Sequence, residues 1–346
     1  MKKFNGKSLA FINNKGGVGK TTLACNLAYD LSTRQGKNIL VLDLDPQCNA
    51  TQLLLPESSW EKILSSDRPY DDKRTILYPV RDFSIGESNI YTDVKPVRSD
   101  RFNVDLVMGH PTLALIEDDL SGAWRNMLGA DLGGARKTVW LNELISQLSS
   151  RYDYVVIDAG PSLGALNRSV IIGSDYIITP TAADLFSLFA LENIADWITN
   201  WSSDFSDALR RVNEKHVSRI GDLNIPHPDN FNSVYLGFTI QQYLTKTSDG
   251  GKRRAVKSYD KYRHEIPSKA EKLATALPGR RDGGNPDLGT VPFMFSMVPL
   301  AQSRNSPIAG LTTDDGIRGA QVNQQKRYKD ELDKIGDNLI KELSQR

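Results

Sequence analysis

The sequence predicts an α/β fold in which a mostly parallel, twisted sheet carries helices on both faces. Short unbroken apolar runs recur along the chain, and such runs are typical of strands that are buried on both sides. Segments with apolar residues three and four positions apart lie between several of these runs, as amphipathic helices require. Two of the runs also end in aspartate. Strands that alternate with helices in this way form parallel sheets.

The elements can be assigned in chain order. Strands are predicted at 8–13, 38–43, 102–107, 154–158, 176–179, 234–240 and 294–298. The clearest helical spacing is at 21–32, 139–149 and 320–343. Residues 55–100 are rich in Pro, Ser, Asp and Arg and predict an irregular insertion, whereas residues 246–290 are polar, basic and rich in glycine.

Composition narrows the class of protein. The 346 residues are 39% hydrophobic and 25% charged, which is typical of a globular chain, and we expect one elaborated domain over 1–346. Cys25 and Cys48 are the two cysteines, so neither a disulfide framework nor a zinc ligand set is expected. No apolar run approaches the roughly 18 residues of a membrane-spanning helix, and the basic start does not continue as a signal peptide. These features predict a cytoplasmic protein.

A glycine-rich segment at 15–22, Lys-Gly-Gly-Val-Gly-Lys-Thr-Thr, joins the first predicted strand to the first helix. Backbone N–H groups at a helix N-terminus bind phosphate, and glycine lets the backbone wrap around it. Lys20 would reach the β- and γ-phosphates, and the Thr21 hydroxyl would bind Mg²⁺. Asn14 stands where the strict P-loop pattern has glycine. The predicted nucleotide contacts are Lys15, Gly16, Gly17, Val18, Gly19, Lys20, Thr21 and Thr22.

Aspartates end two of the predicted strands. Residues 41–51 read Val-Leu-Asp-Leu-Asp-Pro-Gln-Cys-Asn-Ala-Thr, and residues 155–158 read Val-Val-Ile-Asp. A carboxylate at such a strand end can hold Mg²⁺ through water or orient an attacking water for phosphoryl transfer. Asp43 and Asp158 are therefore candidates for the metal shell, and Asp45 is a candidate for the water.

These segments resemble the ParA, MinD and nitrogenase iron-protein class of P-loop ATPases, which has a deviant Walker A motif. Residues 43–51 are similar to the D-x-D-P-Q-x-N-x-T switch I of ParA proteins, and residues 158–164 to their D-x-P-P-S-L-G switch II, with Gly160 in place of the first proline. The resemblance covers roughly residues 8–200. It implies a P-loop NTPase fold that binds ATP and Mg²⁺ and hydrolyses ATP slowly.

The same resemblance implies residue roles and partners. Catalysis would use Lys20, Asp45 and Lys15, and Lys15 would reach across a homodimer of the ATP state to the partner's nucleotide. Asp43 would lie near the metal shell, and Pro299 would contribute to the adenine pocket. A ParB-like activating partner is expected, together with a role in positioning or segregating DNA or a cellular cargo.

Nonspecific DNA is the expected target of the ATP-bound dimer. Residues 246–281 carry eleven lysines and arginines against four acidic residues, and such a patch can neutralise phosphates. A solvated loop is the alternative interpretation of this segment. If the segment binds DNA, a nucleoid-associated protein follows. The candidate contacts are Lys252, Arg253, Arg254, Lys257, Lys261 and Arg263.

Three other functions are alternatives to DNA positioning. A MinD-like membrane role would need the terminal helix as an anchor, but its polar face mixes acids with bases, and we expect it to pack on the protein. An iron–sulfur reductase is disfavoured because Cys25 and Cys48 fall in the P-loop helix and in switch I. A metabolic P-loop ligase or synthetase remains open, although residues 43–51 match the partition ATPases better.

Overall fold

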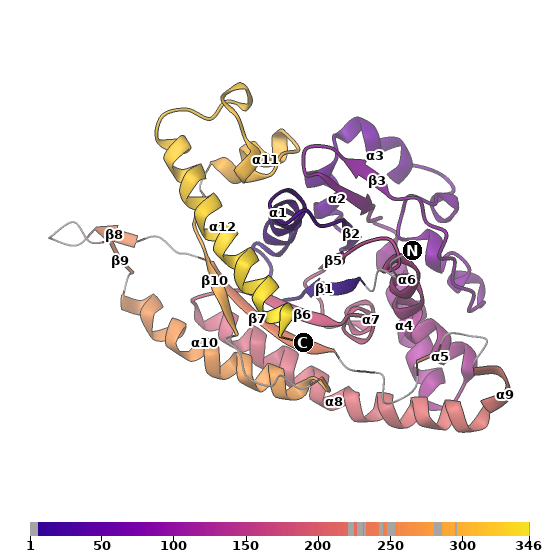
Figure 1. Cartoon of the computed structure of the whole chain (residues 1–346). Helices are drawn as coiled ribbons and strands as arrows, with labels where there is room; N and C mark the ends of the chain where they lie inside the picture. The colour runs from indigo at the N-terminus through magenta and orange to yellow at the C-terminus, as the bar shows by residue number, and fades with distance from the viewer. Residues whose placement is uncertain are drawn as a thin grey trace.

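A twisted sheet of eight strands forms the centre of the molecule (Figure 1). The computed structural model describes residues 6–220, 225–226, 231, 233–241, 245–247, 253–255, 257–279, 286–294 and 296–345, and side chains of residues 242–260 lie outside its description. Within these residues the strand order is β10-β7-β6-β1-β5-β2-β4-β3. All neighbours are parallel except β3, which is antiparallel to β4. The α/β fold class predicted from the sequence is confirmed.

The sheet strands are β1 Lys7–Phe11, β2 Ile39–Leu44, β3 Val97–Ser99, β4 Val104–Val107, β5 Tyr154–Ala159, β6 Tyr176–Ala182, β7 Val234–Gln241 and β10 Asp287–Val291. A separate two-stranded ribbon consists of β8 Thr245–Thr247 and β9 Arg253–Ala255. The helices before β6 are α1 Lys20–Thr33, α2 Asn49–Leu54, α3 Glu57–Leu64, α4 Leu113–Leu128, α5 Leu132–Thr138, α6 Trp140–Leu148 and α7 Ala165–Gly173. Those after it are α8 Leu185–Lys215, α9 Val217–Ile220, α10 Lys257–Ala276, α11 Met297–Ser303 and α12 Ala320–Ser344.

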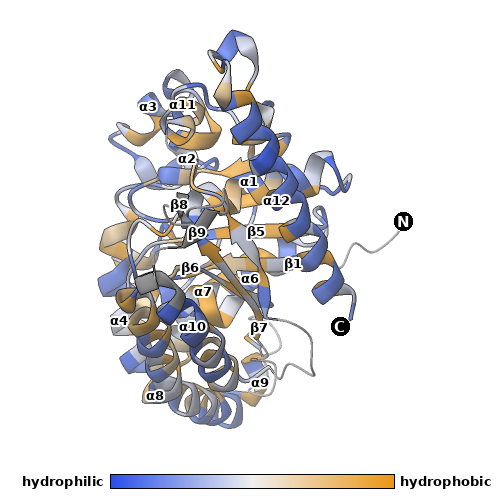
Figure 2. Ribbon diagram, turned by 90° about the vertical axis from the view of Figure 1, so that its left-hand side faces the viewer, coloured by the Kyte–Doolittle hydropathy of each residue, from blue (hydrophilic) through white to orange (hydrophobic). Residues whose placement is uncertain are grey.

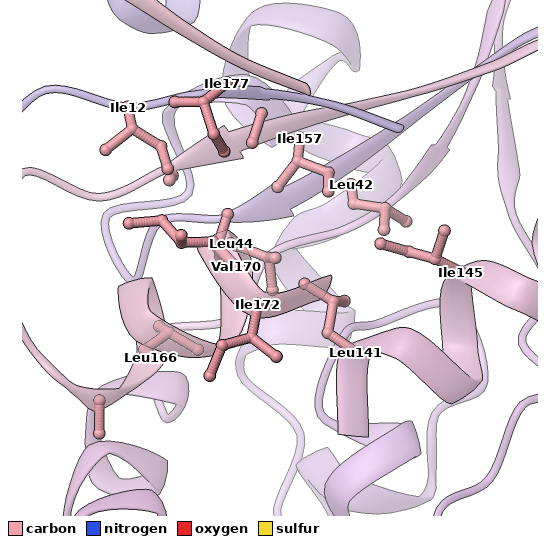
Figure 3. Packing of buried hydrophobic residues seen from close by; sticks show 14 of the residues in the cluster. Ile12, Leu42, Leu44, Leu141, Ile145, Ile157, Leu166, Val170, Ile172 and Ile177 are labelled. Atoms are coloured by element: carbon pink, nitrogen blue, oxygen red, sulfur yellow. The ribbon is translucent and has the colours of Figure 1, made fainter. Parts of the chain in front are cut away.

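Two apolar layers cover the sheet because alternate strand residues point to opposite faces. Ala10 and Leu42 face a cluster that includes residues of α4 to α8 and of α10, and Figure 3 shows part of this packing. Leu9 and Val41 face a second cluster, which includes residues of α1, α2, α11 and α12. In Figure 2, α8 and α10 lie side by side as an outer pair on the first face.

The strand register brings the acidic strand ends together. β1 lies between β5 and β6, so the loop that leaves β1 lies beside the end of β5. Asp43 of β2 is paired in register with Asp158 of β5. The carboxyl ends of these parallel strands therefore place residues 15–22, 43–51 and 158–164 at one edge of the sheet, where α/β proteins usually bind ligands. We call this edge the nucleotide edge.

One predicted strand is wrong. Residues 294–298 do not form a strand, because Met297, the buried Ala301 and their neighbours belong to helix α11. The outer neighbour of β7 is β10, whose sequence Asp-Leu-Gly-Thr-Val is too polar to give a strong apolar signal. β10 lies at the edge of the sheet, where a strand needs only one hydrogen-bonded neighbour.

Two segments differ in part from the sequence prediction. Residues 55–100 are irregular only in their middle, which consists of short 3₁₀ turns, since α3 lies near one end and β3 at the other. Within residues 246–290, the stretch 257–276 forms the long helix α10. The terminal helix α12 is confirmed, and its residues Leu332, Ile335 and Leu339 are buried against the core.

Candidate nucleotide and metal site

The loop from β1 to α1 has the shape of a phosphate cradle. Gly17 and Gly19 both adopt a φ of 74°, in the left-handed region that favours glycine. Asn13 fixes the start of the loop, because its side chain donates to the Pro180 carbonyl and accepts from the Lys15 N–H. In the described part of the chain, the backbone N–H groups of residues 16–22 donate to no protein acceptor. These N–H groups, among them those of Gly16, Val18 and Thr22, remain available for an anionic ligand.

Lys20 is the first residue of α1 and is 92% withdrawn from solvent, with an exposed fraction of 8%. Burial lowers the pKa of its ammonium group, while the carboxylates of Asp158 and Asp45 act in the opposite direction. A buried cation beside carboxylates, facing the loop of free N–H groups, is suited to bind phosphate oxygens. The structure thus places Lys20 beside the acidic strand ends, and its contacts with phosphate stay a prediction.

Asp158 is the next-to-last residue of β5 and contacts the P-loop helix directly. Its Oδ2 atom accepts a hydrogen bond of 2.7 Å from the Thr21 hydroxyl. Its Oδ1 atom is buried and has no hydrogen-bond partner among the described residues. Burial raises the pKa of this carboxyl to about 8, and the nearby charge of Asp43 adds to the rise. A buried carboxylate oxygen without a partner is costly, so the site calls for a cation or a proton.

The Thr21 hydroxyl and the Asp158 carboxylate are oxygen donors that fit Mg²⁺. Within the described ranges no three His, Cys, Asp or Glu side chains are grouped as metal ligands. Mg²⁺ does not require such a group, because it keeps several waters and is usually held by one or two protein oxygens together with substrate phosphates. Thr21 and Asp158 supply those oxygens beside the phosphate cradle.

Asp43 is engaged with the protein itself. Its Oδ2 atom accepts from the backbone N–H of Thr51 at 2.8 Å and from the Thr51 hydroxyl at 2.7 Å. The Thr51 hydroxyl in turn accepts from the Gly109 N–H at 2.9 Å. Burial raises the pKa of Asp43 to about 6, although the bonds from Thr51 oppose that rise. Asp43 thus fastens α2 to the strand end, and its assignment to the metal shell stays a prediction.

Asp45 belongs to switch I and lies against Gly160 of switch II. Its Oδ1 atom accepts from the Gln47 N–H at 2.9 Å, and a Cβ atom added to Gly160 would lie 3.4 Å from the same oxygen. Switch I and switch II therefore meet at Asp45. The Asn167 side chain holds switch II by donating to the carbonyls of Gly160 and Ser162, at 2.8 and 2.6 Å.

Lys15 forms an ion pair with Asp184, the N-cap of α8, and donates to the Ser187 hydroxyl at 3.2 Å. Sequence reasoning assigned no role to Asp184. The signal that could have found it is its position, because it comes directly after β6 and so falls at the nucleotide edge. Gln241, the last residue of β7, was also missed, and a Cβ atom added to Gly19 would lie 2.6 Å from its Nε2 atom.

Pro299 is not placed at the end of a strand. It is an exposed residue inside α11, whereas the proline that directly follows β10 is Pro292. The described contacts link α11 to α2 and to the turn at 308–310, and none of them brings Pro299 to the P-loop. Its role in an adenine pocket stays a prediction without support from its position.

The proposed DNA contacts are described only in part. Lys252 lies outside the described residues, and of Arg253, Arg254 and Lys257 only the backbone is described. Lys261 and Arg263 are exposed on α10. Farther along α10 two lysines pair with acids of α8, Lys269 with Glu192 and Lys272 with Asp196. The basic segment is therefore partly neutralised by its neighbouring helix.

Comparisons with known proteins identify the family of the chain. The AAA_31 family model, described as an AAA domain, matches residues 6–210, more than half of the chain. The protein DIP2308 from Corynebacterium diphtheriae, known as a crystal structure, is 32% identical with a TM-score of 0.72, over 86% of this chain and 97% of that one. The sporulation initiation inhibitor protein Soj of Bacillus subtilis is 28% identical over 56% of this chain and 65% of its own.

A more distant structure shows the fold alone. The putative plasmid partition protein of Borrelia burgdorferi, solved with AMPPNP, is 17% identical with a TM-score of 0.56, over 97% of this chain and 99% of that one. Among curated relatives, matches such as Soj cover less than two thirds of the relative's length. The family assignment accordingly rests on residues 6–210 and on the P-loop geometry. The chain belongs to the AAA_31 family of AAA domains and is a P-loop ATPase of the ParA and MinD type.

Proposed function

We propose that the chain is a nucleotide switch that binds ATP with Mg²⁺, dimerises, and hydrolyses ATP slowly to release its target, with residues 1–346 acting as one P-loop domain. The observation that carries the proposal is the cradle itself: backbone N–H groups at residues 16–22 that donate to no acceptor among the described residues, the buried Lys20, and the bonded pair Thr21 and Asp158. Several fixed donors aimed at one place are the usual device for binding a triphosphate.

Different groups of the chain would bind the phosphates, hold the metal and orient the water. The backbone N–H groups and Lys20 would bind the phosphates, and Thr21 with Asp158 would hold Mg²⁺, which when bound supplies positive charge against the phosphate oxygens. Asp45, at the meeting point of the switches, would orient the water that attacks the γ-phosphorus as the bond to the β,γ-bridging oxygen breaks. Gly160 has an N–H that proline would lack, so its backbone could donate to the γ-phosphate.

The homodimer proposal rests on Lys15. Its ion pair with Asp184 holds it within its own subunit in the single chain. To serve a partner's nucleotide, Lys15 must leave Asp184, and a partner's phosphates would compensate for the lost pair. Exchange of one ion pair for another would couple dimerisation to ATP. An activating partner of the ParB kind would then act on this dimer.

Nonspecific DNA is the target that we propose for the ATP-bound dimer. The ribbon β8–β9 and α10 follow the end of β7, so the basic segment begins at the nucleotide edge (Figure 1). Lys261 and Arg263 are exposed on α10 and are not used in ion pairs with described residues. A protein that binds DNA in this way would lie in the cytoplasm on the nucleoid.

The membrane alternative is less well supported. Among the described residues no helix is both long and apolar enough to cross a membrane. The apolar stripe of α12 packs on β10 and α1, and Arg34, the C-cap of α1, pairs with Asp333 and Asp337 of α12. An interfacial anchor would need that stripe free. For a ligase or synthetase, no described feature identifies a substrate.

The test is binding of fluorescent nonspecific duplex DNA with ATP, with ADP and without nucleotide, at low and at high salt. We expect binding with ATP alone, weakening steeply as salt rises. ATP hydrolysis should be measured in the same preparations. Hydrolysis without DNA binding in any state would contradict the DNA target and leave the switch intact, whereas no nucleotide binding would contradict the proposal as a whole.

A further inference from the structure

Helix α7 starts where switch II ends, and its N-terminus is capped by a different helix. Gly164 is the N-cap and has no side chain to accept a hydrogen bond, and the first turn of α7 contains no acidic residue. Glu117 of α4 supplies the cap, because its carboxylate accepts from the N–H of Ala165 and, at 2.9 Å, from that of Leu166. Negative charge at a helix N-terminus stabilises the helix.

We propose that Glu117 is a positioning residue for ATP hydrolysis, which holds switch II in place through the start of α7. This inference rests on the proposed function. The link from Glu117 to the site is a continuous series of hydrogen bonds and close contacts. Glu117 holds the first N–H groups of α7, and Asn167, in the first turn of that helix, holds the carbonyls of Gly160 and Ser162. Gly160 in turn lies against Asp45.

Helix α7 can transmit the position of its N-terminus to switch II because it packs firmly in the apolar core. Figure 3 shows Leu166 and Val170 of α7 in the same apolar cluster as Leu44 and Ile12 of the central sheet. A second contact with α4 lies one turn farther along, where the Arg168 guanidinium stacks 4.0 Å from the centroid of the Trp124 ring. Glu117 and Trp124 are seven residues apart, so both lie on one face of α4. Helix α4 therefore contacts α7 at two points, through Glu117 and through Trp124.

The absence of a side chain at Gly164 leaves room for the Glu117 carboxylate. A Cβ atom at this position would lie 2.0 Å from Glu117 Oε1 and 2.7 Å from Glu117 Cδ, and its three nearest neighbours all belong to Glu117. The backbone of Gly164 has φ −104° and ψ −172°, an extended conformation that any residue can adopt. A methyl group at residue 164 would therefore act on the Glu117 carboxylate and not through backbone strain.

The expected effect is on catalysis and not on nucleotide affinity. Glu117 has no described contact with the P-loop or with Lys20, so ATP should bind as before. Small displacements of groups around the reacting phosphate can reduce a rate by about 100-fold. We expect Glu117→Ala to lower kcat for ATP hydrolysis about tenfold and to change the Kd of a fluorescent non-hydrolysable ATP analogue less than twofold. Glu117→Gln, which keeps one acceptor, should lose about threefold.

A double-mutant cycle separates this role from general destabilisation. Gly164→Ala should lower kcat like Glu117→Ala, but should cause no further loss in the Glu117→Ala background, because the carboxylate it displaces is gone. Asp118→Ala and Gly122→Ala, at exposed or open positions of α4, are the matched controls and should leave kcat unchanged. All assays are made well below the thermal midpoint of each variant.

The outcomes distinguish a failure of the proposed function from a failure of the positioning role of Glu117. If the wild-type protein binds and hydrolyses no ATP, the proposed function fails. If the wild-type protein hydrolyses ATP and Glu117→Ala has the same kcat, the positioning role is wrong although the function stands. Additive losses from Glu117→Ala and Gly164→Ala, or a parallel loss of analogue affinity, would also overturn it.

Discussion

At the nucleotide edge Lys20, Asp43 and Asp158 are withdrawn from water, whereas on α10 Lys261 and Arg263 are exposed. The buried carboxylates have raised pKa values, and one oxygen of Asp158 has no hydrogen-bond partner in the part of the chain that the structure describes. Farther along α10, Lys269 and Lys272 are already paired with acids of α8. At the nucleotide edge, burial of charge is unfavourable, and a bound ligand can relieve that cost. On α10 the exposed charges are already solvated by water.

The difference predicts how each region responds to mutation. Single changes among buried, desolvated charges should have large effects that depend little on salt. Changes among exposed charges should be small, roughly additive and dependent on salt. The four predictions below test this contrast, from the largest expected effect to the smallest.

Lys20→Ala should abolish measurable nucleotide binding. Two charge-assisted hydrogen bonds of about 1.5–3 kcal/mol each correspond to a loss of roughly 100- to 10,000-fold in affinity. Titration with a fluorescent ATP analogue measures this, and Lys62→Ala, an exposed lysine of α3, is the control. Analogue affinity within tenfold of the wild type would show that the phosphates do not lie against Lys20.

Asp45→Ala should keep nucleotide binding and lose hydrolysis, because the proposed role of Asp45 is to orient the attacking water and the P-loop is untouched. Loss of a positioned group that orients or accepts protons typically lowers kcat by about 100-fold or more. ATP should therefore trap a dimer, which size-exclusion chromatography with light scattering detects. Asp45→Asn tests the charge with the shape kept, and the exposed Asp67→Ala is the control. Normal hydrolysis by Asp45→Ala would show that switch I is wrongly assigned.

The strand pattern and the glycine-rich loop were sufficient to predict the fold and the placement of Lys20, Thr21 and Asp158. Local sequence carries those signals, since β1, β2 and β5 are continuous apolar runs whose ends coincide with the site. β10 was missed because an edge strand with Gly289 and polar neighbours has no such run.

The contacts of Lys15 and Glu117 could not be predicted from local sequence. Lys15 and Asp184 are 169 positions apart, and Glu117 lies 48 positions before Ala165. No spacing rule links such residues, because only the packing of α4, α7 and α8 on the sheet brings them together. The paired lysines of α10 were counted as free charge for the same reason.

The pH dependence of the nucleotide-free protein should follow from Asp158. Its folded-state pKa of about 8 lies above its ordinary value of 3.8, so the folded state holds a proton that the unfolded state releases between these values. The stability contributed by this group is present below about pH 4 and is lost as pH rises toward 8, with a slope of at most about 1.4 kcal/mol per pH unit. Asp43, with a pKa of about 6, acts in the same direction over a lower window.

Asp158→Asn should accordingly flatten the fall in thermal midpoint between pH 6 and pH 8, where Asp43 has largely titrated. It should also abolish ATP hydrolysis, because one of the proposed metal-shell oxygens is lost. Thermal unfolding of the nucleotide-free protein at several pH values measures the first effect, with the exposed Asp314→Asn as control. A wild-type midpoint that rises from pH 6 to pH 8, with Asp158→Asn following it, would contradict the raised pKa.

The smallest effects are expected on α10, where the chain supplies its own matched control. The double variant Lys261→Ala/Arg263→Ala removes two exposed charges, whereas Lys269→Ala/Lys272→Ala removes two that pair with Glu192 and Asp196. If each exposed charge contacts one phosphate, the first variant should bind DNA several-fold more weakly, and its plot of log K against log salt should be shallower by about 1.8. The second variant should change the slope less, because its lysines already have partners and release fewer counterions. Equal slopes for the two variants would mean that pairing with α8 does not limit the charge available to DNA, and an unchanged slope for both would place the DNA surface elsewhere on the molecule.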